Sequence, residues 1–480
     1  MRKILALLLS LLLPGSLVAQ TTAMRAIGPV AFTHVTVTDV TGAPSKADAT
    51  VIVAGDRIAA VGKSGKVRIP KDAQVVDATG KFLIPGLWDM HAHTLTDDRQ
   101  EWLFLLLIAN GVTGVRELGN NLSFERIIQI RREILEGKIL GPRFGATTAR
   151  ILDGPGTTIP NVSTVVTSTD QARQLVKTYK QQGMDFIKVY NLLAREVYLA
   201  IVDEARLQKI PVSGHVPFSM TATEVSDLGQ ITLEHVQIGI FVSCSRDEAK
   251  LRREWQELIR SGQPGAGLRI MAKAVETYDE QTAQRFFARL KRNGTYVCPT
   301  SVVFNPVELI ADESKLLNDS RMKYIPERSR QRWGDVFQQR NNAVAPHAER
   351  KARSDLRLKI VGAMHRAGVG LLAGADAPNP YVFPGFSLHE ELELLVQAGL
   401  SPLAALQTAT INPAKFLGIE KEIGTIEKGK LADLVLLDAD PLANITNTRQ
   451  INAVIANGRY FSREQLQKML ADVEARVSKN

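Results

Sequence analysis

Two histidines one residue apart close a short apolar segment, Ile84-Pro85-Gly86-Leu87-Trp88-Asp89-Met90-His91-Ala92-His93. Alternate side chains point to the same face of a β-strand, so this spacing directs both imidazole rings to one point in space. Neutral imidazole is the commonest protein ligand for metal ions. The pair therefore predicts a metal site, although such a pair is also compatible with an ordinary surface or core position.

Other residues with ligand chemistry follow further apolar, extended segments. They are Lys188 in Ile187-Lys188-Val189, His215 after Val212-Ser213-Gly214, His235 after Leu233-Glu234, and Asp376 after Gly374-Ala375. Each has a plainer interpretation by itself: a buried core histidine, a lysine whose ammonium reaches solvent, or an aspartate that caps the next helix. Together with His91 and His93 they predict one shared site.

The middle of the chain alternates short β-rich runs with helical stretches, which is typical of repeated βα units and a parallel sheet. The predicted strands end near His93, Leu118, Ile151, Tyr190, Val216, Val236, Thr300 and Asp376. Eight parallel strands close into an α/β TIM barrel, (β/α)8, whose reactive groups lie at the C-terminal ends of the strands. The candidate ligands fall at or near those ends, so the fold and the site support each other.

The two ends of the chain predict a second, smaller domain. Residues 31–81 and 424–460 are rich in alternating Val, Ile and Thr with interspersed Asp and Gly, and we expect them to pair as one composite β-sandwich. The predicted division is a signal peptide (1–19), an N-terminal part of the sandwich (20–82), the barrel (83–417), a C-terminal part of the sandwich (418–462) and a terminal amphipathic helix (463–480).

The first residues have the pattern of a signal peptide. Arg2 and Lys3 precede the apolar run 4–13, which is followed by Pro14 and by small residues up to Ala19. The run is too short to span a bilayer. We therefore expect an exported protein, periplasmic or secreted, with no membrane segment after cleavage.

The charge of the chain indicates which kinds of partner it can bind, and its two cysteines indicate which cross-link it can form. The formal net charge is +9, and residues 321–359 contain eleven Lys or Arg against four Asp or Glu. This basic segment is interpreted as a solvated helical face, or as a surface for an anionic substrate or membrane, and no nucleic-acid motif accompanies it. Cys244 and Cys298 permit one disulfide in an exported protein or two buried thiols, and they match no zinc-ligand spacing.

The ordered set of strand-end residues resembles the amidohydrolase superfamily, in particular its imidazolonepropionase-like and Xaa-Pro dipeptidase-like members. The resemblance also includes Asn110 to Thr113, Pro402 to Ala414 and Gly424 to Val435, and it extends over nearly all of the chain after residue 19. The loop 153–158 departs from it, because dipeptidase-like relatives often carry Gly-Gly-His-Gly there and this loop has no histidine.

The resemblance implies a binuclear site. His91, His93 and Asp376 would bind the more buried ion, His215 and His235 the more exposed one, and Lys188, carboxylated by carbon dioxide, would bridge the two. An unmodified ammonium has no lone pair for a metal, whereas a carbamate has two anionic oxygens, and a buried lysine with a lowered pKa reacts as the neutral amine. Two Zn²⁺ ions fit these ligands best, with manganese, cobalt or iron as alternatives.

The implied activity is hydrolysis of amide or peptide-type C–N bonds in a small-molecule substrate, of the dipeptide or N-acyl amino acid class. A metal-activated hydroxide attacks the carbonyl, and Asp376 carries a proton to the leaving nitrogen. Tyr190 points to the same side of its strand as Lys188 and either hydrogen-bonds the oxyanion or packs at the barrel mouth; Arg150 and the turn 378–381 are candidate substrate contacts.

Two other functions stay open at this point. A phosphotriesterase or lactonase would use the same activated hydroxide, and a non-catalytic scaffold or binding protein would keep the barrel without the chemistry. Retention of all six ligands favours an enzyme. The chain is also compatible with a homo-oligomer.

Overall fold

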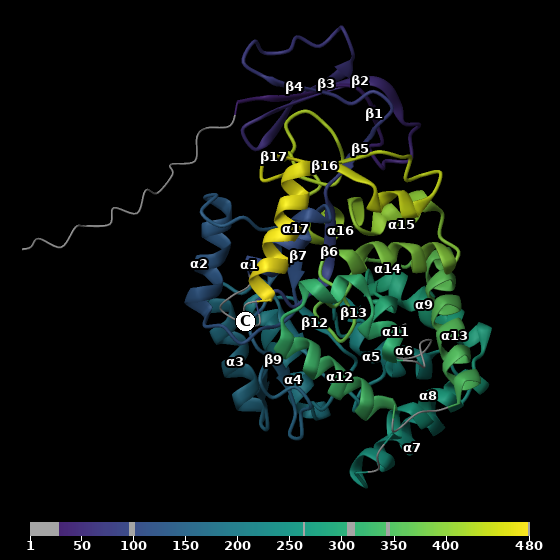
Figure 1. Cartoon of the computed structure of the whole chain (residues 1–480). Helices are drawn as coiled ribbons and strands as arrows, with labels where there is room; N and C mark the ends of the chain where they lie inside the picture. Colours follow the sequence, from purple (N-terminus) through teal and green to yellow (C-terminus); the bar gives the residue numbers. More distant parts are fainter. Residues whose placement is uncertain (1–27, 96–100, 263–264, 305–312, 342–345, 479–480) are drawn as a thin grey trace, which may run out of the picture.

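The computed structural model describes residues 28–95, 101–262, 265–304, 313–341 and 346–478. The predicted signal peptide lies outside the described residues. Figure 1 shows the N-terminal strands and the last strands, β16 and β17, together at one end of the molecule, while the middle of the chain forms the larger body. The site is carried by this larger body.

One mixed sheet combines the two ends of the chain. Its order is β17-β16-β15-β5-β1-β2-β3, with β4 paired to β1. Strand β5 joins the two ends, because it pairs parallel with β1 and antiparallel with β15. The strands are β1 (Val30–Val37), β2 (Lys46–Ala54), β3 (Arg57–Lys63), β4 (Gln74–Asp77), β5 (Phe82–Pro85), β15 (Leu434–Leu437), β16 (Ile451–Ala456) and β17 (Arg459–Ser462).

An apolar cluster built from both chain ends covers this sheet, with Phe32, Leu83 and Leu436 among its buried members. Alternating Val and Ile side chains supply most of it, as expected for strands with one buried face. The predicted two-layer sandwich stays a prediction. The C-terminal part begins its first strand only at Leu434, so the Gly-rich stretch from Gly424 is a loop with one isolated bridge at Leu431.

Two parallel sheets form the larger body. The first has the order β6-β7-β8 and the second the order β10-β9-β11-β12-β13-β14. Most of their residues are buried, which is usual for parallel strands that are covered on both faces. The strands are β6 (Leu87–Ala92), β7 (Val112–Glu117), β8 (Arg143–Thr147), β9 (Ile151–Asp153), β10 (Ser163–Val165), β11 (Ile187–Val189), β12 (Val212–Gly214), β13 (Thr232–Glu234) and β14 (Tyr296–Cys298).

Backbone hydrogen bonds connect the two parallel sheets on both sides. The Asp185 N–H donates to the Thr147 carbonyl at 2.9 Å. On the other side, the segment 370–377 lies between β14 and β6: one of its N–H groups donates to the Val297 carbonyl at 3.0 Å and another to the His91 carbonyl at 2.6 Å. The strand ends that carry the candidate ligands therefore face the same side.

Two strand predictions are corrected. The strand predicted as the third ends at Thr147, and Ile151, predicted as its end, begins the separate strand β9. The eighth predicted strand, ending at Asp376, forms only single parallel bridges. Gly370 and Gly374 weaken strand formation there, and Asp376 has a left-handed backbone with φ +58°.

Helices follow most of the parallel strands. They are α1 (Glu101–Ala109), α2 (Phe124–Leu135), α3 (Thr169–Gln181), α4 (Arg195–Gln208), α5 (Ala222–Asp227), α6 (Ile238–Ser243), α7 (Glu248–Arg260), α8 (Ala266–Glu276), α9 (Glu280–Asn293), α11 (Glu313–Leu317), α12 (Glu327–Asn341), α13 (His347–Ala367), α14 (Phe386–Gln397), α15 (Pro402–Thr408), α16 (Ile411–Leu417), α17 (Arg463–Val477) and the short 3₁₀ helices η1 (Ser301–Val303), η2 (Ser320–Tyr324) and η3 (Ile445–Arg449). Among the described residues, no helix is both long and apolar enough to cross a membrane.

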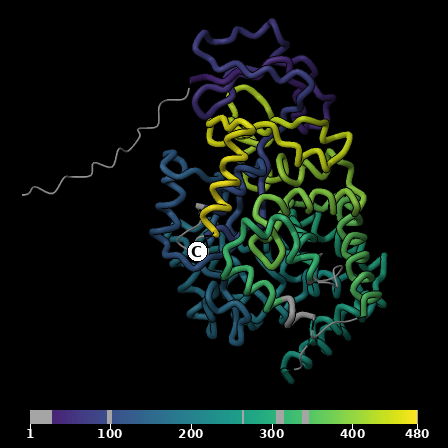
Figure 2. The backbone as a smooth tube through the Cα atoms, viewed as in Figure 1, coloured from purple at the N-terminus to yellow at the C-terminus, as the bar shows by residue number. Residues whose placement is uncertain are grey.

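The last helix, α17, connects the two parts of the molecule. Figures 1 and 2 show it running back from the end sheet along α1. A capping box at Ser462 starts the helix. Its apolar face, with Leu466 and Val473, packs on Leu106 and Ile108 of α1.

Candidate metal centre

The structure brings all six predicted ligands to the C-terminal side of the parallel strands. They are His91 near the end of β6, His93 just after it, Lys188 in β11, His215 after β12, His235 after β13 and Asp376 in the segment 370–377. Every one except His93 is at most 7% exposed. The side chain of His93 is 19% exposed, so it lies at the open side of the site.

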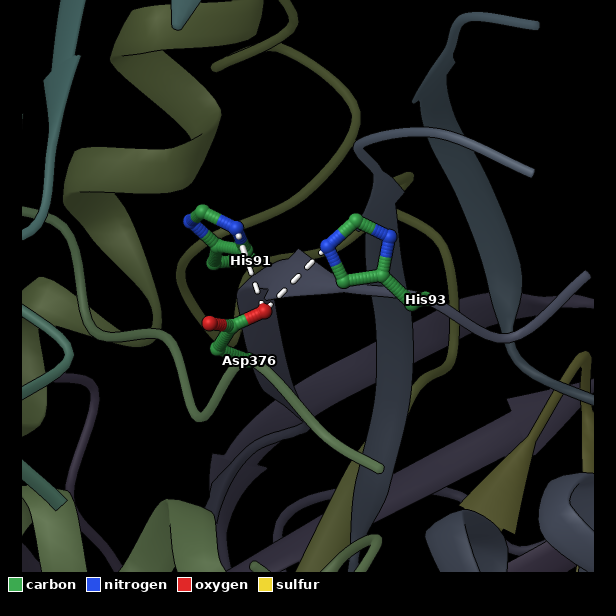
Figure 3. Close-up of side chains that lie close together, drawn as sticks. All are labelled: His91, His93 and Asp376. Carbon is green, nitrogen blue, oxygen red and sulfur yellow. Dashed lines mark ion pairs between the residues drawn. The ribbon is translucent and has the colours of Figure 1, made fainter. Parts of the chain in front are cut away.

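Three imidazole rings converge on the Asp376 carboxylate. The Nε2 atoms of His91 and His93 lie 3.4 and 3.2 Å from its Oδ1 (Figure 3), and Nε2 of His235 lies 3.8 Å from its Oδ2. Ligand atoms of His91, His93 and Asp376 all lie within 4.8 Å of one another. His215 joins the group through His235, with ring centroids 4.7 Å apart. The spacing is suited to a small cation.

The opposite nitrogen, Nδ1, of each of these four histidines faces a hydrogen-bond acceptor. The pairs are His91 with Glu234 Oε2 (2.9 Å), His93 with the Gly119 carbonyl (2.8 Å), His215 with Asn191 Oδ1 (2.9 Å) and His235 with Thr300 Oγ1 (2.6 Å). The Thr300 hydroxyl donates to the Pro299 carbonyl at 2.8 Å, so its oxygen accepts from His235.

These partners select one tautomer of each ring. A carbonyl or carboxylate oxygen can only accept, so the hydrogen resides on Nδ1. For His215 the Asn191 oxygen, at 2.9 Å, is nearer to Nδ1 than the Gln237 Nε2 donor at 3.3 Å. In each neutral ring the Nε2 lone pair is then left for the centre. Metal-binding histidines have this arrangement, in which the outer hydrogen bond orients the ring and increases its basicity. The four rings are thus prepared for a metal through atoms of the protein alone.

Burial and neighbouring charges set the protonation of these groups. Burial lowers the pKa of His91 and His215 well below the usual range and that of His235 to about 4, so the three rings are neutral. Burial alone would raise the pKa of Asp376, but the surrounding histidines more than offset this and hold its pKa below the ordinary value. Burial alone would lower the pKa of His93, but its hydrogen bond with Asp376 and the charge of that carboxylate more than offset this and raise it. The site therefore presents three neutral imidazoles, and His93 with a raised pKa, around an ionised carboxylate.

Lys188 completes the donor set. Its Nζ is fully buried and has no hydrogen-bond partner among the described residues. Burial lowers the pKa of Lys188 to about 8, although Glu234 and Asp376 oppose this shift. A lysine with these properties is readily neutral and can react with carbon dioxide. The amine interacts electrostatically with His91, His215, His235 and Asp376, so Lys188 belongs to the same cluster.

The other predicted site residues have mixed outcomes. The ring of Tyr190 packs against His215, with centroids 4.0 Å apart, and its role toward an oxyanion stays a prediction. Arg150 was predicted to contact substrate, but its guanidinium donates to the carbonyls of Pro160, Asn161 and Ser163 at 2.5–3.0 Å. Arg150 therefore holds its own loop. The thiols of Cys244 and Cys298 are both buried and free, so they form no disulfide.

Several supporting residues escape sequence reasoning: Asn191, Thr300, Glu234, Arg116 and Glu117. The available signal was the charge of Arg116 and Glu117 at the end of an otherwise apolar strand. Glu234 could not be predicted as a site residue, because the two-residue repeat of a strand places its side chain on the opposite face from that of His235. His235 has φ +65°, and this left-handed backbone breaks the alternation, so both side chains face the interior.

The chain is similar in sequence and in fold to known proteins. The chain is 40% identical over 75 residues to the imidazolonepropionase of Symbiobacterium thermophilum, a match that covers 15% of this chain. The matched segments span only 10–33% of the length of such curated relatives.

Among solved structures, a bottromycin amidohydrolase is 23% identical with a TM-score of 0.71, over 94% of this chain and 90% of the other. A Xaa-Pro dipeptidase with bound methionine is 19% identical with a TM-score of 0.62, over 91% of this chain and 100% of the other. At these identities the likeness shows the fold alone. The sequence model of the amidohydrolase family matches residues 82–460, and the chain therefore belongs to the amidohydrolase family.

Proposed function

We propose that this protein is an exported, binuclear-metal hydrolase that cleaves amide or peptide-type C–N bonds of dipeptides or N-acyl amino acids. The observation that carries the proposal is the convergence of His91, His93 and His235 on Asp376, with His215 packed on His235 and the unpartnered Nζ of Lys188 nearby. Each of the four histidines has its Nδ1 bound to an acceptor. A dipeptidase and an amidohydrolase among the similar structures support the C–N substrate class.

The proposal includes a closed (β/α)8 barrel. Its support is the backbone hydrogen bonds that link the two parallel sheets on both sides, at Asp185 and through the segment 370–377. Export is proposed from the signal-peptide pattern of residues 1–19.

His91, His93 and Asp376 would hold one ion, His215 and His235 the other, and carboxylated Lys188 would bridge them. Zn²⁺ suits this mixture of imidazole and carboxylate oxygens. When bound, two such ions supply a water that ionises near neutral pH and a Lewis acid for the substrate carbonyl.

The side chains of the protein would transfer the proton, orient the imidazole rings and exclude bulk water. The ionised Asp376 carboxylate is placed to take a proton and hold it at Oδ1 or Oδ2 until the leaving nitrogen needs it. The outer hydrogen bonds of the histidines keep the rings from rotating during this transfer. Because the surrounding side chains are nearly all buried, bulk water is kept from the reacting groups and charge interactions there are strong.

The first test is elemental analysis of the purified mature protein, together with a substrate panel. The panel contains N-acyl amino acids, dipeptides with and without proline, a phosphotriester and a lactone, each measured before chelation, after chelation and after return of Zn²⁺. We expect about two metal ions per chain and chelator-sensitive C–N hydrolysis. One ion per chain would contradict the binuclear site, and faster turnover of the phosphotriester would favour that alternative.

The bridging role of Lys188 has a separate test. Lys188→Ala should lose metal and activity, and a short-chain carboxylate should restore part of both by replacing the carbamate. Protein prepared in ¹³C-bicarbonate should show a carbamate resonance that the variant lacks. Lys180→Ala, at an exposed lysine of α3, is the control. Full metal content in unrescued Lys188→Ala would refute the bridge.

A further inference from the structure

A buried ion pair lies beside the candidate metal centre. Arg116 from β7 and Glu234 from β13 are 1% and 2% exposed, and Arg116 Nη2 donates to Glu234 Oε1 at 2.8 Å. Glu234, His91 and Cys298 also place ligand atoms within 4.8 Å of one another, so Glu234 is close enough to be considered a metal ligand itself. The surroundings of the pair decide between a ligand and a supporting residue.

Arg116 is held on every side. Its Nε donates to the Met90 carbonyl at 2.7 Å, directly before His91, and its Nη1 lies 3.2 Å from Thr232 Oγ1. The rings of Phe416 and Phe186 lie 5.1 and 6.0 Å from the guanidinium carbon. Since a guanidinium stays charged in proteins, its burial requires an anion beside it, and Glu234 is the carboxylate that it contacts.

The two oxygens of Glu234 have different tasks. Oε1 accepts from Arg116 at 2.8 Å, from Thr232 Oγ1 at 2.5 Å and from Ser213 Oγ at 3.2 Å. Oε2 lies 2.9 Å from Nδ1 of His91. The three donors on Oε1 prevent the Glu234 carboxylate from rotating. The left-handed backbone of the next residue, His235, keeps the Glu234 side chain in the interior, so Oε2 points to the His91 ring.

We infer that Glu234, anchored by Arg116, is a positioning residue that holds His91 with its hydrogen on Nδ1 and its Nε2 lone pair toward Asp376. It is not a metal ligand, because a cation between Glu234 and Cys298 would lie on the Nδ1 side of His91, next to the positive charge of Arg116. This inference deepens the proposed function and rests on it, since the lone pair so prepared is the one offered to the metal.

Glu234→Gln gives a sharp test because it keeps the size of the side chain. Arg116 can only donate, so it takes the amide oxygen, and the amide NH₂ then faces Nδ1 of His91. That contact requires a lone pair on Nδ1, so the ring must carry its hydrogen on Nε2. The variant should therefore reverse the tautomer of His91 and block the atom that binds metal.

The tautomer is read in metal-free protein from ¹⁵N NMR of histidine-labelled samples, with the His91 signals assigned by their loss in His91→Gln. Metal affinity is measured by competition with a chromogenic chelator for Zn²⁺. We expect Nδ1–H in the unmodified protein, Nε2–H in Glu234→Gln, and metal affinity lower by about 10- to 100-fold, with the number of ions at saturation unchanged. Glu204→Gln, at a buried carboxylate of α4 that accepts from Gln208, should change neither.

Each outcome decides the inference. Loss of one ion at saturating Zn²⁺ in Glu234→Gln, or in Cys298→Ala, would make these residues ligands and overturn it. If Glu234→Gln changes neither the His91 tautomer nor the zinc affinity, the Arg116–Glu234 pair has only a packing role in the core, and the inference is overturned as well. If the unmodified protein binds no metal, the proposed function fails, while the His91 tautomer in Glu234→Gln still decides whether Glu234 positions the ring.

Discussion

Replacing Gly374 by alanine should damage the candidate metal centre through packing alone. Gly374 lies in the segment between β14 and β6, and a Cβ added there would lie 2.6 Å from Sγ of Cys298, 2.7 Å from Cβ of His91 and 2.8 Å from its backbone nitrogen. Non-bonded heavy atoms of this kind prefer separations of about 3.5–4.0 Å. Each contact is therefore short by roughly 1 Å.

The neighbours of Gly374 have little room to move away. The His91 N–H donates to the Asp89 carboxylate at 3.1 Å, and its carbonyl accepts the Asp376 N–H at 2.6 Å, so a shift of His91 disturbs two hydrogen bonds. Overpacking of a well-filled core costs about 1–3 kcal/mol. A displacement of about 1 Å at a catalytic group lowers turnover by about 100-fold.

The assay is urea unfolding together with zinc competition and turnover of the best substrate. Gly374→Ala should be less stable by about 1–3 kcal/mol and bind zinc more weakly. Gly267→Ala is the matched control, because the nearest neighbour of an added Cβ is the Cδ1 of Ile238 at 3.9 Å, an ordinary van der Waals distance. Unchanged stability and zinc affinity in Gly374→Ala would refute the packing argument.

Thr300→Ala removes the acceptor for His235 and should weaken zinc binding by about 10- to 100-fold in the competition assay, whereas Thr300→Ser should not. Arg150→Met should cost about 2–3 kcal/mol in urea unfolding with KM unchanged; a raised KM at full stability would restore its role as a substrate contact. Burial raises the pKa of Glu391 to about 7 from 4.5, so the folded protein holds a proton that the unfolded chain releases. Stability should therefore fall by up to about 3 kcal/mol as pH rises from about 4.5 through 7, and Glu391→Gln should flatten this profile in urea titrations; an unchanged slope would contradict it.

The ligand positions could be predicted because they depend on local pattern. His91 and His93 share one face through the two-residue repeat of a strand, and Lys188, His215 and His235 lie at or just after the ends of short apolar runs. The eighth strand could not be predicted correctly. Its segment is extended by sequence, but its hydrogen bonds go to β14 and β6, and only that pairing decides whether it forms a regular ladder.

The sequence by itself determined which residue types could bind a metal and that strand ends would carry them, since side-chain chemistry and strand periodicity are properties of neighbouring residues. Only the tertiary structure decided which nitrogen of each ring faces the centre. The acceptors that decide this, such as Glu234 for His91 and Thr300 for His235, lie 143 and 65 residues away along the chain. The left-handed backbones of His235 and Asp376 were also decided by the tertiary structure. Contacts with distant strands, and not the local sequence, hold a non-glycine residue in that conformation.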